Sequence, residues 1–362
     1  MAEKFIGLIS GTSADGVDAA LVEFDPAPRV IAALTEPYPD ELRHELLRFM
    51  AGVYRGDPID QLMRLDHAVG ERFASAANAV LAQSGTAAKA VRAVGSHGQT
   101  LRHRPPGSTL QVGDPNLIAA RLDLPVIADF RRMDMAVGGQ GAPLVPAFHR
   151  AALSSAIEAR AIVNIGGIAN VTLLAADGST AGGDVGPGNA LLDAWCAAQG
   201  GGRFDAGGAL AARGRIDVAL LERLKAEPYF ARPLPKSTGR ELFNLAWLEA
   251  ALVRGLTAAD VQATLAELSA LAIADALRPL RPARVLACGG GVHNHHLMQR
   301  LTQLLAPLPL TTTAEFGLDP DFVEAAAFAW LARETLAGRP GNAPTATGAT
   351  RSAVLGGRFG PP

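Results

Sequence analysis

A short meander of strands joined by a glycine-rich turn occurs twice in this chain, and this repetition constrains the fold more than any other feature. In the first copy, a turn at residues 10–16 separates two apolar runs, at 5–9 and 17–24. In the second copy, the Gly166-Gly167 turn follows an apolar run at 160–165. A Rossmann unit does not begin with such a meander. We therefore predict an α/β protein whose two halves share one topology.

Helices follow each meander. Apolar residues at helical spacing predict a helix at 59–83 in the first half, and a helix is also expected at 258–277 in the second. We place the two halves at residues 1–135 and 136–338. The remaining segment, 339–362, is rich in Gly, Pro, Thr and Ala, and we expect it to pack back on the body of the protein.

The charge balance argues against several classes of partner. The 362 residues include 33 Lys and Arg against 35 Asp and Glu, a net charge of −2, which gives no electrostatic footprint for nucleic acid or an anionic membrane. Cys196 and Cys288 lie far apart without CxxC spacing, so neither a disulfide scaffold nor a Cys-rich zinc site is expected. Without a signal peptide or an apolar run of roughly 20 residues, the chain is expected to be a soluble cytoplasmic protein.

The turn after the first strand has the composition of a phosphate-binding loop. Its small residues expose backbone N–H groups, and its hydroxyl groups add donors suited to a β- or γ-phosphate. Asp15 and Asp18 are carboxylates able to hold Mg²⁺ directly or through water. Taken alone, the same residues favour an ordinary hairpin with Asp and Gly in turn positions. The cofactor-binding residues expected here are Gly11, Thr12, Ser13, Ala14, Asp15, Gly16, Val17 and Asp18.

Two further glycine turns belong to the second half. Gly166 and Gly167 allow close backbone approach to an anion, although a plain hairpin explains them equally well. The recurrence of a glycine turn at the same place in both halves favours phosphate binding. Three consecutive glycines, Gly289, Gly290 and Gly291, stand between a buried strand and a helix. Because they are costly in backbone entropy, they indicate a site where a base and ribose lie against bare backbone. The sequence here has neither the GxGxxG spacing of a dinucleotide-binding turn nor the motif of a P-loop.

Asp184 is a carboxylate closely surrounded by glycines. Residues 182–189 are expected to form a glycine-rich turn, with four glycines and a proline around Asp184. This turn comes just before an expected helix, whose N-terminus favours negative charge. We favour a catalytic or metal-coordinating role over helix capping, because Asn189 is the more natural cap. Glu324 begins another expected helix. The sequence does not decide whether it is a charge that stabilises the first turn of this helix or a carboxylate of the site.

Two further strand ends carry polar groups able to bind the hydroxyls or carboxylate of a sugar. The strand end at 95–100 contains His97 and Gly98, and a later strand end contains Asp129 and Arg131. A histidine such as His97, taken alone, is more often a structural hydrogen-bonding residue.

Taken in order along the chain, these motifs resemble those of the anhydro-N-acetylmuramic acid kinase family, within the actin/hexokinase/Hsp70 nucleotide-binding superfamily. The resemblance runs from the first turn to the tail, and several motifs in the right order make it specific. Ala14 and Val185 stand where other side chains are commoner. The matching segments are residues 11–18, 96–100, 129–131, 164–170, 184–189 and 347–351.

The resemblance implies two actin-like or ribonuclease H-like halves, each a mixed sheet flanked by helices, with a cleft between them. It implies ATP-dependent conversion of 1,6-anhydro-N-acetylmuramic acid to N-acetylmuramic acid 6-phosphate in peptidoglycan recycling, with ATP and Mg²⁺ as cofactors. The glycine turns would hold phosphate and adenosine. Asp184 would be the base that activates water, with Glu324 as a second carboxylate. The sugar would be bound by His97, Gly98, Asp129, Arg131 and Asp184.

One departure leaves the metal ligands open. Many sugar kinases carry an Asp two residues before the Gly-Thr pair of the phosphate turn, and this chain has Ile9 there. The Mg²⁺ ligands are therefore unassigned from the sequence.

Proteins of other functional classes fit this sequence less well. A sugar- or nucleotide-sensing repressor would want a DNA-binding helix pair, whereas the chain begins directly with a strand. An ordinary hexose or amino-sugar kinase is excluded only by the family-specific motifs, and a dehydrogenase fails on glycine spacing. The expected partners are the anhydro-sugar and ATP, without nucleic acid or membrane, and a homodimer is left open.

Overall fold

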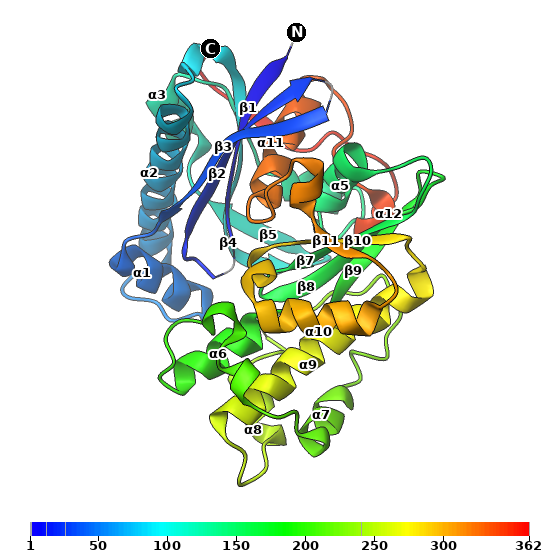
Figure 1. Cartoon of the computed structure of the whole chain (residues 1–362). Coiled ribbons are helices and arrows are strands. Elements are labelled where there is room, and N and C mark those ends of the chain that lie inside the picture. Colours follow the sequence, from blue (N-terminus) through cyan, green and yellow to red (C-terminus); the bar gives the residue numbers. More distant parts are fainter. Residues whose placement is uncertain (1, 12, 26, 240, 362) are drawn as a thin grey trace. The chain divides into compact units, whose positions relative to one another are not determined.

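Two compact units make up the chain, shown in sequence colours in Figure 1. The computed structural model describes residues 2–11, 13–25, 27–239 and 241–361, so Thr12 of the first turn lies outside the described residues. Unit 1 holds the chain up to Ala152 and again from Gly317 onward, and unit 2 holds Leu153–Phe316.

A mixed sheet flanked by helices forms unit 1. Its strands are β1 (Glu3–Ser10), β2 (Gly16–Asp25), β3 (Ala27–Pro37), β4 (Val91–Arg104), β5 (Ser108–Val112), β6 (Val126–Ala128) and β12 (Gly357–Phe359). Its helices are α1 (Asp40–Met50), α2 (Pro58–Ser84), the 3-10 helix η1 (Ala88–Ala90), α3 (Pro115–Leu122), α4 (Phe130–Ala136), α5 (Val145–Leu153), α11 (Val323–Leu336) and α12 (Pro344–Thr347). The strand order is β12-β6-β4-β1-β2-β3, with β5 paired to β4. β1, β2 and β3 are antiparallel neighbours, whereas β4 runs parallel to both β1 and β6.

Alternate residues of β1 face the helices on the two sides of this sheet. Ile6 and Leu8 belong to the buried core that α2 completes. Gly7, between them, points to the other face, where an added Cβ would lie 1.8 Å from a backbone oxygen of α11. Gly95 on β4 meets α11 in the same way, at 2.0 Å. These two glycines allow the backbone of α11 to approach the sheet closely, and Figure 1 shows α2 and α11 beside it.

The division into units differs from the boundaries expected at residues 135 and 338. Residues 136–152 and helix α11 belong to unit 1, because α11 packs on β1, β2 and β4. The C-terminal segment adds β12 to the same sheet, antiparallel to β6. The chain thus leaves unit 1 and returns to it. The predicted halves were continuous segments of the sequence, so they did not include this return.

Unit 2 is built around a second mixed sheet. Its strands are β7 (Arg160–Ile165), β8 (Ile168–Leu174), β9 (Thr180–Pro187), β10 (Arg284–Cys288) and β11 (Leu310–Thr312). Its α-helices are α6 (Ala190–Ala198), α7 (Val218–Lys225), α8 (Leu245–Ala251), α9 (Ala258–Leu277) and α10 (His295–Leu305). Its 3-10 helices are η2 (Ala206–Gly208), η3 (Ala211–Arg213), η4 (Arg278–Leu280), η5 (Gly290–His293) and η6 (Thr313–Phe316). The strand order is β11-β10-β7-β8-β9.

The two sheets share one topology. In each, three antiparallel strands form a meander whose first strand has a parallel neighbour on its other side, so that β7, β8 and β9 correspond to β1, β2 and β3. The predicted halves of one topology are therefore confirmed. The glycine-rich segment around Asp184 was expected as a turn and is instead strand β9. An added Cβ on Gly182 would lie 2.3 Å from the carbonyl oxygen of Val171, so glycine permits the close approach of β9 to β8.

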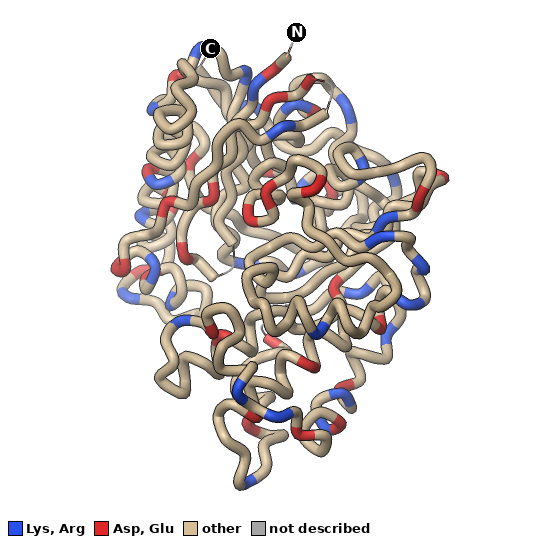
Figure 2. The backbone as a smooth tube through the Cα atoms, in the orientation of Figure 1, with Lys and Arg blue, Asp and Glu red and all other residues tan. Residues whose placement is uncertain are grey.

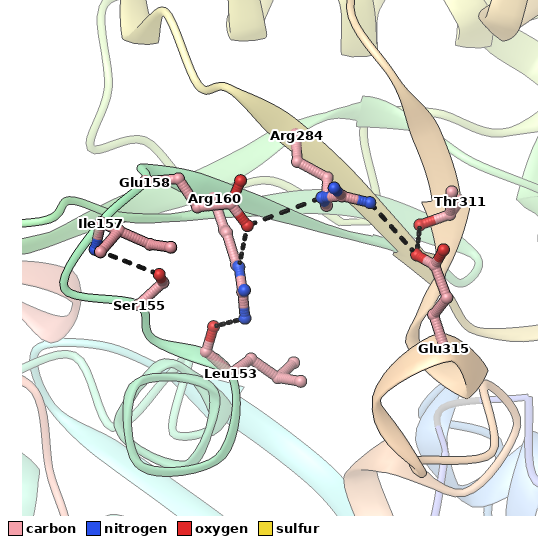
Figure 3. Close-up of polar contacts among 8 residues, drawn as sticks. All are labelled: Leu153, Ser155, Ile157, Glu158, Arg160, Arg284, Thr311 and Glu315. Atoms are coloured by element: carbon pink, nitrogen blue, oxygen red, sulfur yellow. Dashed lines mark hydrogen bonds and ion pairs between the residues drawn. The ribbon is translucent and has the colours of Figure 1, made fainter.

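An ion-pair network holds the strand starts of unit 2, as Figure 3 shows. Arg160 at the start of β7 donates to Glu158 at 2.7 Å and to the carbonyl oxygen of Leu153 at 3.0 Å. Its guanidinium also lies over the ring of Phe316, 4.4 Å from the centroid. Arg284 at the start of β10 pairs with the same Glu158 at 3.6 Å. Arg160 thus contacts both the first and the last residue of unit 2.

Charged residues of both signs are interspersed along each unit, as the blue and red segments of Figure 2 show. Among the described residues, no helix combines the length and the apolar character needed to cross a bilayer.

Candidate functional site

A row of polar side chains crosses the sheet of unit 2 one residue before the end of β7. Asn164 on β7 pairs with Asn170 on β8, which in turn pairs with Asp184 on β9. All three are partly buried. Paired residues of adjacent strands lie on the same face of a sheet, so the register brings together an acid and two amides that are distant in sequence.

Asp184 is held by a loop that follows α7. The amide of Thr238 and the hydroxyl of Ser237 donate to its Oδ2 at 3.0 and 3.1 Å. Burial raises the pKa of the Asp184 carboxyl, these two hydrogen bonds lower it, and the charge of Glu241 raises it. The result is an oriented carboxylate with a pKa above its ordinary value, and such a group is suited to accept a proton.

The same loop also binds the backbone of Asp184. The Asp184 amide donates to the carbonyl of Lys236 at 2.8 Å, and the Tyr229 hydroxyl donates to the carbonyl of Asp184 at 2.8 Å. Lys236 Nζ donates to the carbonyl of Tyr229 at 3.0 Å, which closes the loop. Sequence reasoning missed Ser237 and Thr238, because two hydroxyl residues after a lysine form no motif until the loop is seen against β9.

The Gly166-Gly167 turn is closed by the start of α6. The carbonyl of Gly166 accepts from the amide of Asn189 at 2.8 Å, and that of Gly167 accepts from Gly188 at 3.0 Å. Asn189 occupies the N-cap position of α6, as expected, but its side chain donates to the carbonyl of Ile165 at 3.0 Å instead of capping the helix. These contacts fix the turn beside the polar row.

The three consecutive glycines have different surroundings. An added Cβ on Gly289 would lie 2.3 Å from Oδ1 of Asn164, and one on Gly291 would lie 2.2 Å from the side chain of Ile165. Apart from its chain neighbours and its own 3-10 helix, no described residue has an atom within 4 Å of the Cβ position of Gly290. Gly290 instead lines a cavity of ≈ 380 Å³ in unit 2. Two of the glycines therefore pack against β7, and the third leaves its backbone open to a ligand.

Aromatic side chains border this cavity. Phe204 and His293 line it together with Gly290, and Phe204 is 60% exposed. An exposed aromatic ring beside bare backbone offers two faces between which a planar group can stack. Phe204 was not identified from the sequence, since it lies in a glycine-rich loop with no periodic pattern.

In unit 1, the turn after β1 is held by Gln99 of β4. The hydroxyl of Ser10 donates to Gln99 Oε1 at 2.6 Å, and Gln99 Nε2 donates to the carbonyl of Gly11 at 3.1 Å. The same carbonyl accepts from the amide of Ala14 at 3.1 Å. Ala14 is buried and has a φ of 51°. Hydrogen bonds therefore hold Ser10, Gly11 and Ala14, and Ser13 is half-buried.

Three residues expected to bind cofactor in this turn have structural explanations. Asp15 pairs with Arg43 of α1 at 2.9 Å. Val17 is fully buried in the hydrophobic core, and an added Cβ on Gly16 would lie 2.4 Å from the backbone oxygen of Glu36. Packing and ion pairing account for these three residues without a ligand.

Asp18, Glu324 and Arg131 form a charged cluster in unit 1. Thr35 donates to Asp18 at 2.6 Å, yet burial raises the pKa of Asp18 to about 6, and the charges of Asp321 and Asp15 add to the rise. Glu324 keeps contact with solvent in the first turn of α11. Protein atoms crowd its carboxyl and raise its pKa, Asp18 raises it further, and Arg131 lowers it. Acids and a cation that shift one another's pKa values are typical of a site that binds charged ligands.

His97 lies within β4, which continues to Arg104 past the strand end expected at 95–100, and it meets Arg131 of α4 in unit 1. Arg131 Nε donates to His97 Nε2 at 2.9 Å, and Arg131 Nη1 donates to the carbonyl of Gly141 at 2.7 Å. Burial lowers the pKa of Arg131 to about 10, opposed by the charges of Glu324 and Asp134. Burial, followed by the charge of Arg131, holds the pKa of His97 well below its ordinary value. His97 is thus neutral and engaged with Arg131.

The other two residues expected at the sugar site have well-defined backbone positions. Gly98 has a φ of 75°, and an added Cβ there would lie 2.6 Å from the carbonyl oxygen of Val112. Asp129 precedes α4 with a φ of 63° and pairs with Arg132 at 3.3 Å. Burial raises the pKa of Asp129, and Arg132 lowers it. Both residues shape the backbone that carries His97 and Arg131.

Comparison with known proteins agrees with the motifs. The family model described as anhydro-N-acetylmuramic acid kinase matches residues 3–361. A protein of that name from Xanthomonas campestris pv. campestris is 52% identical, over 97% of this chain and 96% of its own. Proteins of the same name from Saccharophagus degradans (49% identical, 99% of both chains) and Coxiella burnetii (49% identical, 98% and 96%) are also similar. The resemblance seen in the sequence is confirmed, and the chain belongs to the anhydro-N-acetylmuramic acid kinase family.

Proposed function

We propose that this protein is an ATP-dependent kinase that opens 1,6-anhydro-N-acetylmuramic acid and phosphorylates its O6, giving N-acetylmuramic acid 6-phosphate for cell-wall recycling. The observation that carries this proposal is the environment of Asp184. Its carboxyl is oriented by Ser237 and Thr238 and has a raised pKa. Family membership supplies the substrate class.

Asp184 is the base in this proposal. A water molecule attacks C1 of the sugar and loses a proton to Asp184, while the bond between C1 and O6 breaks. O6 forms a bond to the γ-phosphorus of ATP as the bond to ADP breaks. The leaving oxygen is thus captured by phosphorus, so one base is enough where an inverting glycosidase needs a base and an acid. Ser237 and Thr238, the donors from the described part of the loop, both reach Oδ2, and Oδ1 is the proposed acceptor of the proton of water.

We assign the nucleotide to the glycine turns and the cavity of unit 2. The bare backbone of Gly290 and the exposed ring of Phe204 are suited to hold adenine between them. Within unit 2, the Gly166-Gly167 turn is proposed to contact phosphates through backbone N–H groups. Within unit 1, the turn containing Gly11 and Ser13 is proposed as a phosphate-binding segment of the same chemistry. These turns carry small residues where phosphate must come close.

Mg²⁺ is proposed to accompany ATP near Asp18. Burial and neighbouring acids raise the pKa of Asp18 to about 6, and a divalent cation would relieve this repulsion. Among the described residues, no group of three or more His, Cys, Asp or Glu could hold a metal ion. Mg²⁺ commonly uses one or two carboxylates and completes its shell with phosphate oxygens and water. Asp18, with Glu324 nearby, fits that pattern, and the ion would offset the charge of the phosphates.

The acidic side chain of the sugar is assigned to Arg131. Its guanidinium is held by His97 and Gly141, and a fixed guanidinium matches the geometry of a carboxylate. Asp129 and Gly98 are proposed to line the same site, and Glu324 to contact hydroxyl groups or water. A kinase of this specificity should therefore discriminate against sugars that lack the carboxylate.

Mass spectrometry of the product tests the proposed activity. With the anhydro-sugar, ATP and Mg²⁺, the product mass should equal that of the substrate plus one water and one phosphoryl group. A product lacking the added water would indicate an ordinary sugar kinase. An unchanged substrate, with protein shown to be folded by circular dichroism, would overturn the proposed function.

A further inference from the structure

We propose that His97 is a positioning residue that holds the guanidinium of Arg131 in place for the substrate's anionic group. This inference rests on the proposed function of Arg131 and assigns His97 a role apart from direct sugar contact. It is based on the hydrogen bond that Arg131 Nε donates to His97 Nε2, at 2.9 Å.

The chemistry of the two groups fixes the tautomer of His97. A guanidinium Nε–H can only donate, so His97 Nε2 must offer a lone pair. His97 Nδ1 lies 2.9 Å from the carbonyl of Gly98, and a carbonyl can only accept. The proton of a neutral imidazole therefore resides on Nδ1. A protonated imidazole would place a hydrogen between Nε2 and Nε and break this pair.

Packing fixes the ring of His97. It is 6% exposed and lies against Phe328 of α11, with ring centroids 4.7 Å apart. Gly95, two residues earlier on β4, allows α11 to come this close. The imidazole is thus clamped between a peptide carbonyl and an aromatic ring, with its acceptor nitrogen directed at Arg131.

The opposite edge of the guanidinium is held by a second chain of contacts. Gly141 accepts from Arg131 Nη1 at 2.7 Å, and its amide donates to the buried carboxyl of Asp134 at 2.8 Å. Asp134 also accepts from Asn342 and Thr347 of the C-terminal segment, each at 2.8 Å. Two of the five N–H donors of Arg131 are therefore committed to the protein, and the others are directed by these contacts.

This arrangement predicts what each substitution at His97 does. Phe keeps the ring and its packing but removes the acceptor, so Arg131 loses its Nε partner. Gln offers an amide oxygen near the position of Nε2 and restores the acceptor without a titratable group. If His97 instead bound the sugar as an imidazolium, both variants would fail alike.

The test compares His97→Phe, His97→Gln and Arg131→Ala in sugar binding by calorimetry. The ligands are 1,6-anhydro-N-acetylmuramic acid and 1,6-anhydro-N-acetylglucosamine, which lacks the lactyl carboxylate. We expect His97→Phe to weaken binding of the acidic sugar by about 10- to 100-fold, the range for losing a hydrogen bond to a charged group. Binding of the neutral sugar should stay within about threefold of wild type, and His97→Gln should restore most of the lost affinity. Equal loss in His97→Phe and His97→Gln would overturn the role of His97.

Two further results separate this inference from the proposed function. Unchanged affinity of Arg131→Ala for the acidic sugar would refute the assignment of the carboxylate to Arg131. The His97–Arg131 pair is tested without substrate by two-bond ¹H–¹⁵N spectra of ¹⁵N-histidine-labelled protein. The signals of His97 are identified as those that are missing from the spectrum of His97→Gln. We expect a proton on Nδ1 and none on Nε2 from pH 5 to 8. A proton on Nε2, or titration of His97 near pH 6, would contradict the inference even if Arg131 binds the sugar.

Discussion

The two units place a carboxylate on the same row of the same sheet topology, but surround it with different neighbours. In unit 1 the row is Ile9, Asp18 and Thr35 across β1, β2 and β3, and in unit 2 it is Asn164, Asn170 and Asp184 across β7, β8 and β9. In both, burial raises the pKa of the acid.

The neighbours decide what each acid can do. Asp18 lies among the charges of Asp321, Asp15 and Glu324, and a crowd of acids favours a cation or a proton. Asp184 accepts hydrogen bonds from Ser237 and Thr238, which orient it. On the roles proposed above, one topology thus provides a cation-binding acid in one unit and a base in the other.

Removing the base should have the largest effect. Asp184→Asn keeps the shape of the side chain but cannot accept a proton, so we expect kcat to fall by about a thousandfold or more, with ATP affinity unchanged. Steady-state kinetics and calorimetry with ATP measure the two quantities. The matched control is Asp177→Asn, at the turn between β8 and β9, where the exposed carboxylate accepts from the amide of Ser179. Activity of Asp184→Asn near that of the control would move the base to another residue, with Glu324 the first to examine.

Substitution of Asp18, the acid of unit 1, should change the pH dependence of the free energy of unfolding. The pKa of Asp18 is raised from 3.8 to about 6, so the folded state binds its proton more tightly than the unfolded state does. This contribution is fully present below pH 3.8 and is lost as the pH rises through about 6. Asp18→Asn should therefore be more stable than wild type at pH 8, by about 1–3 kcal/mol, and should lose this advantage near pH 4.

Urea unfolding of wild type and Asp18→Asn at pH 4, 6 and 8 measures this difference. The control is Asp177→Asn, which removes an exposed acid whose pKa is lowered rather than raised. Asp217→Asn would be a poor control, because the Asp217 side chain caps α7. A stability difference between wild type and Asp18→Asn that is independent of pH would contradict the raised pKa.

The three consecutive glycines at 289–291, where we propose that the nucleotide binds, offer a sharper contrast within unit 2. Gly290→Ala adds a methyl group that points into the cavity, so we expect the KM for ATP to rise about tenfold with little change in Tm. Gly291→Ala forces a Cβ against Ile165, 2.2 Å away, and should lower stability by about 1–3 kcal/mol. Kinetics and thermal melting of the two variants measure these effects. Equal effects on Tm would mean that Gly290 is also a packing residue.

The smallest effect is expected at the strand starts of unit 2. Arg160→Leu removes the hydrogen bonds to Glu158 and Leu153 drawn in Figure 3, and we expect a loss of about 1–2 kcal/mol in unfolding free energy. Glu249→Leu on α8, outside this network, is the control for adding an apolar side chain. Because Arg160 lies at the opposite end of β7 from the polar row, KM for ATP should not change.

Local sequence patterns were sufficient for the elements that carry their own end signals. The helix expected at 59–83 is α2, which Asp57 caps and Gly85 ends with a φ of 65°. The helix expected at 258–277 is α9, which begins with a capping box of Thr257 and Asp260. In both, backbone hydrogen bonding at the ends is decided by nearby residues.

The features that the sequence did not reveal depend on contacts between distant segments. The glycines around Asp184 suggested a turn, but they serve the pairing of β9 with β8 and with the loop at Lys236. The return of α11 to unit 1 depends on Gly7 and Gly95. Likewise, His97 and Arg131 were each identified, but their hydrogen bond became visible only in three dimensions.

One measurement tests the central claim most directly. Turnover of the anhydro-sugar in ¹⁸O-labelled water, quenched early, should place the label on the anomeric oxygen and none in the phosphate ester, because water attacks C1 while O6 goes to phosphorus. Unlabelled product kept in the same water without enzyme controls for exchange. Attack from the face opposite the bridge should also release the inverted anomer first. Label in the phosphate ester, or a phosphorylated product that still contains the anhydro ring, would contradict Asp184 as the base that activates water.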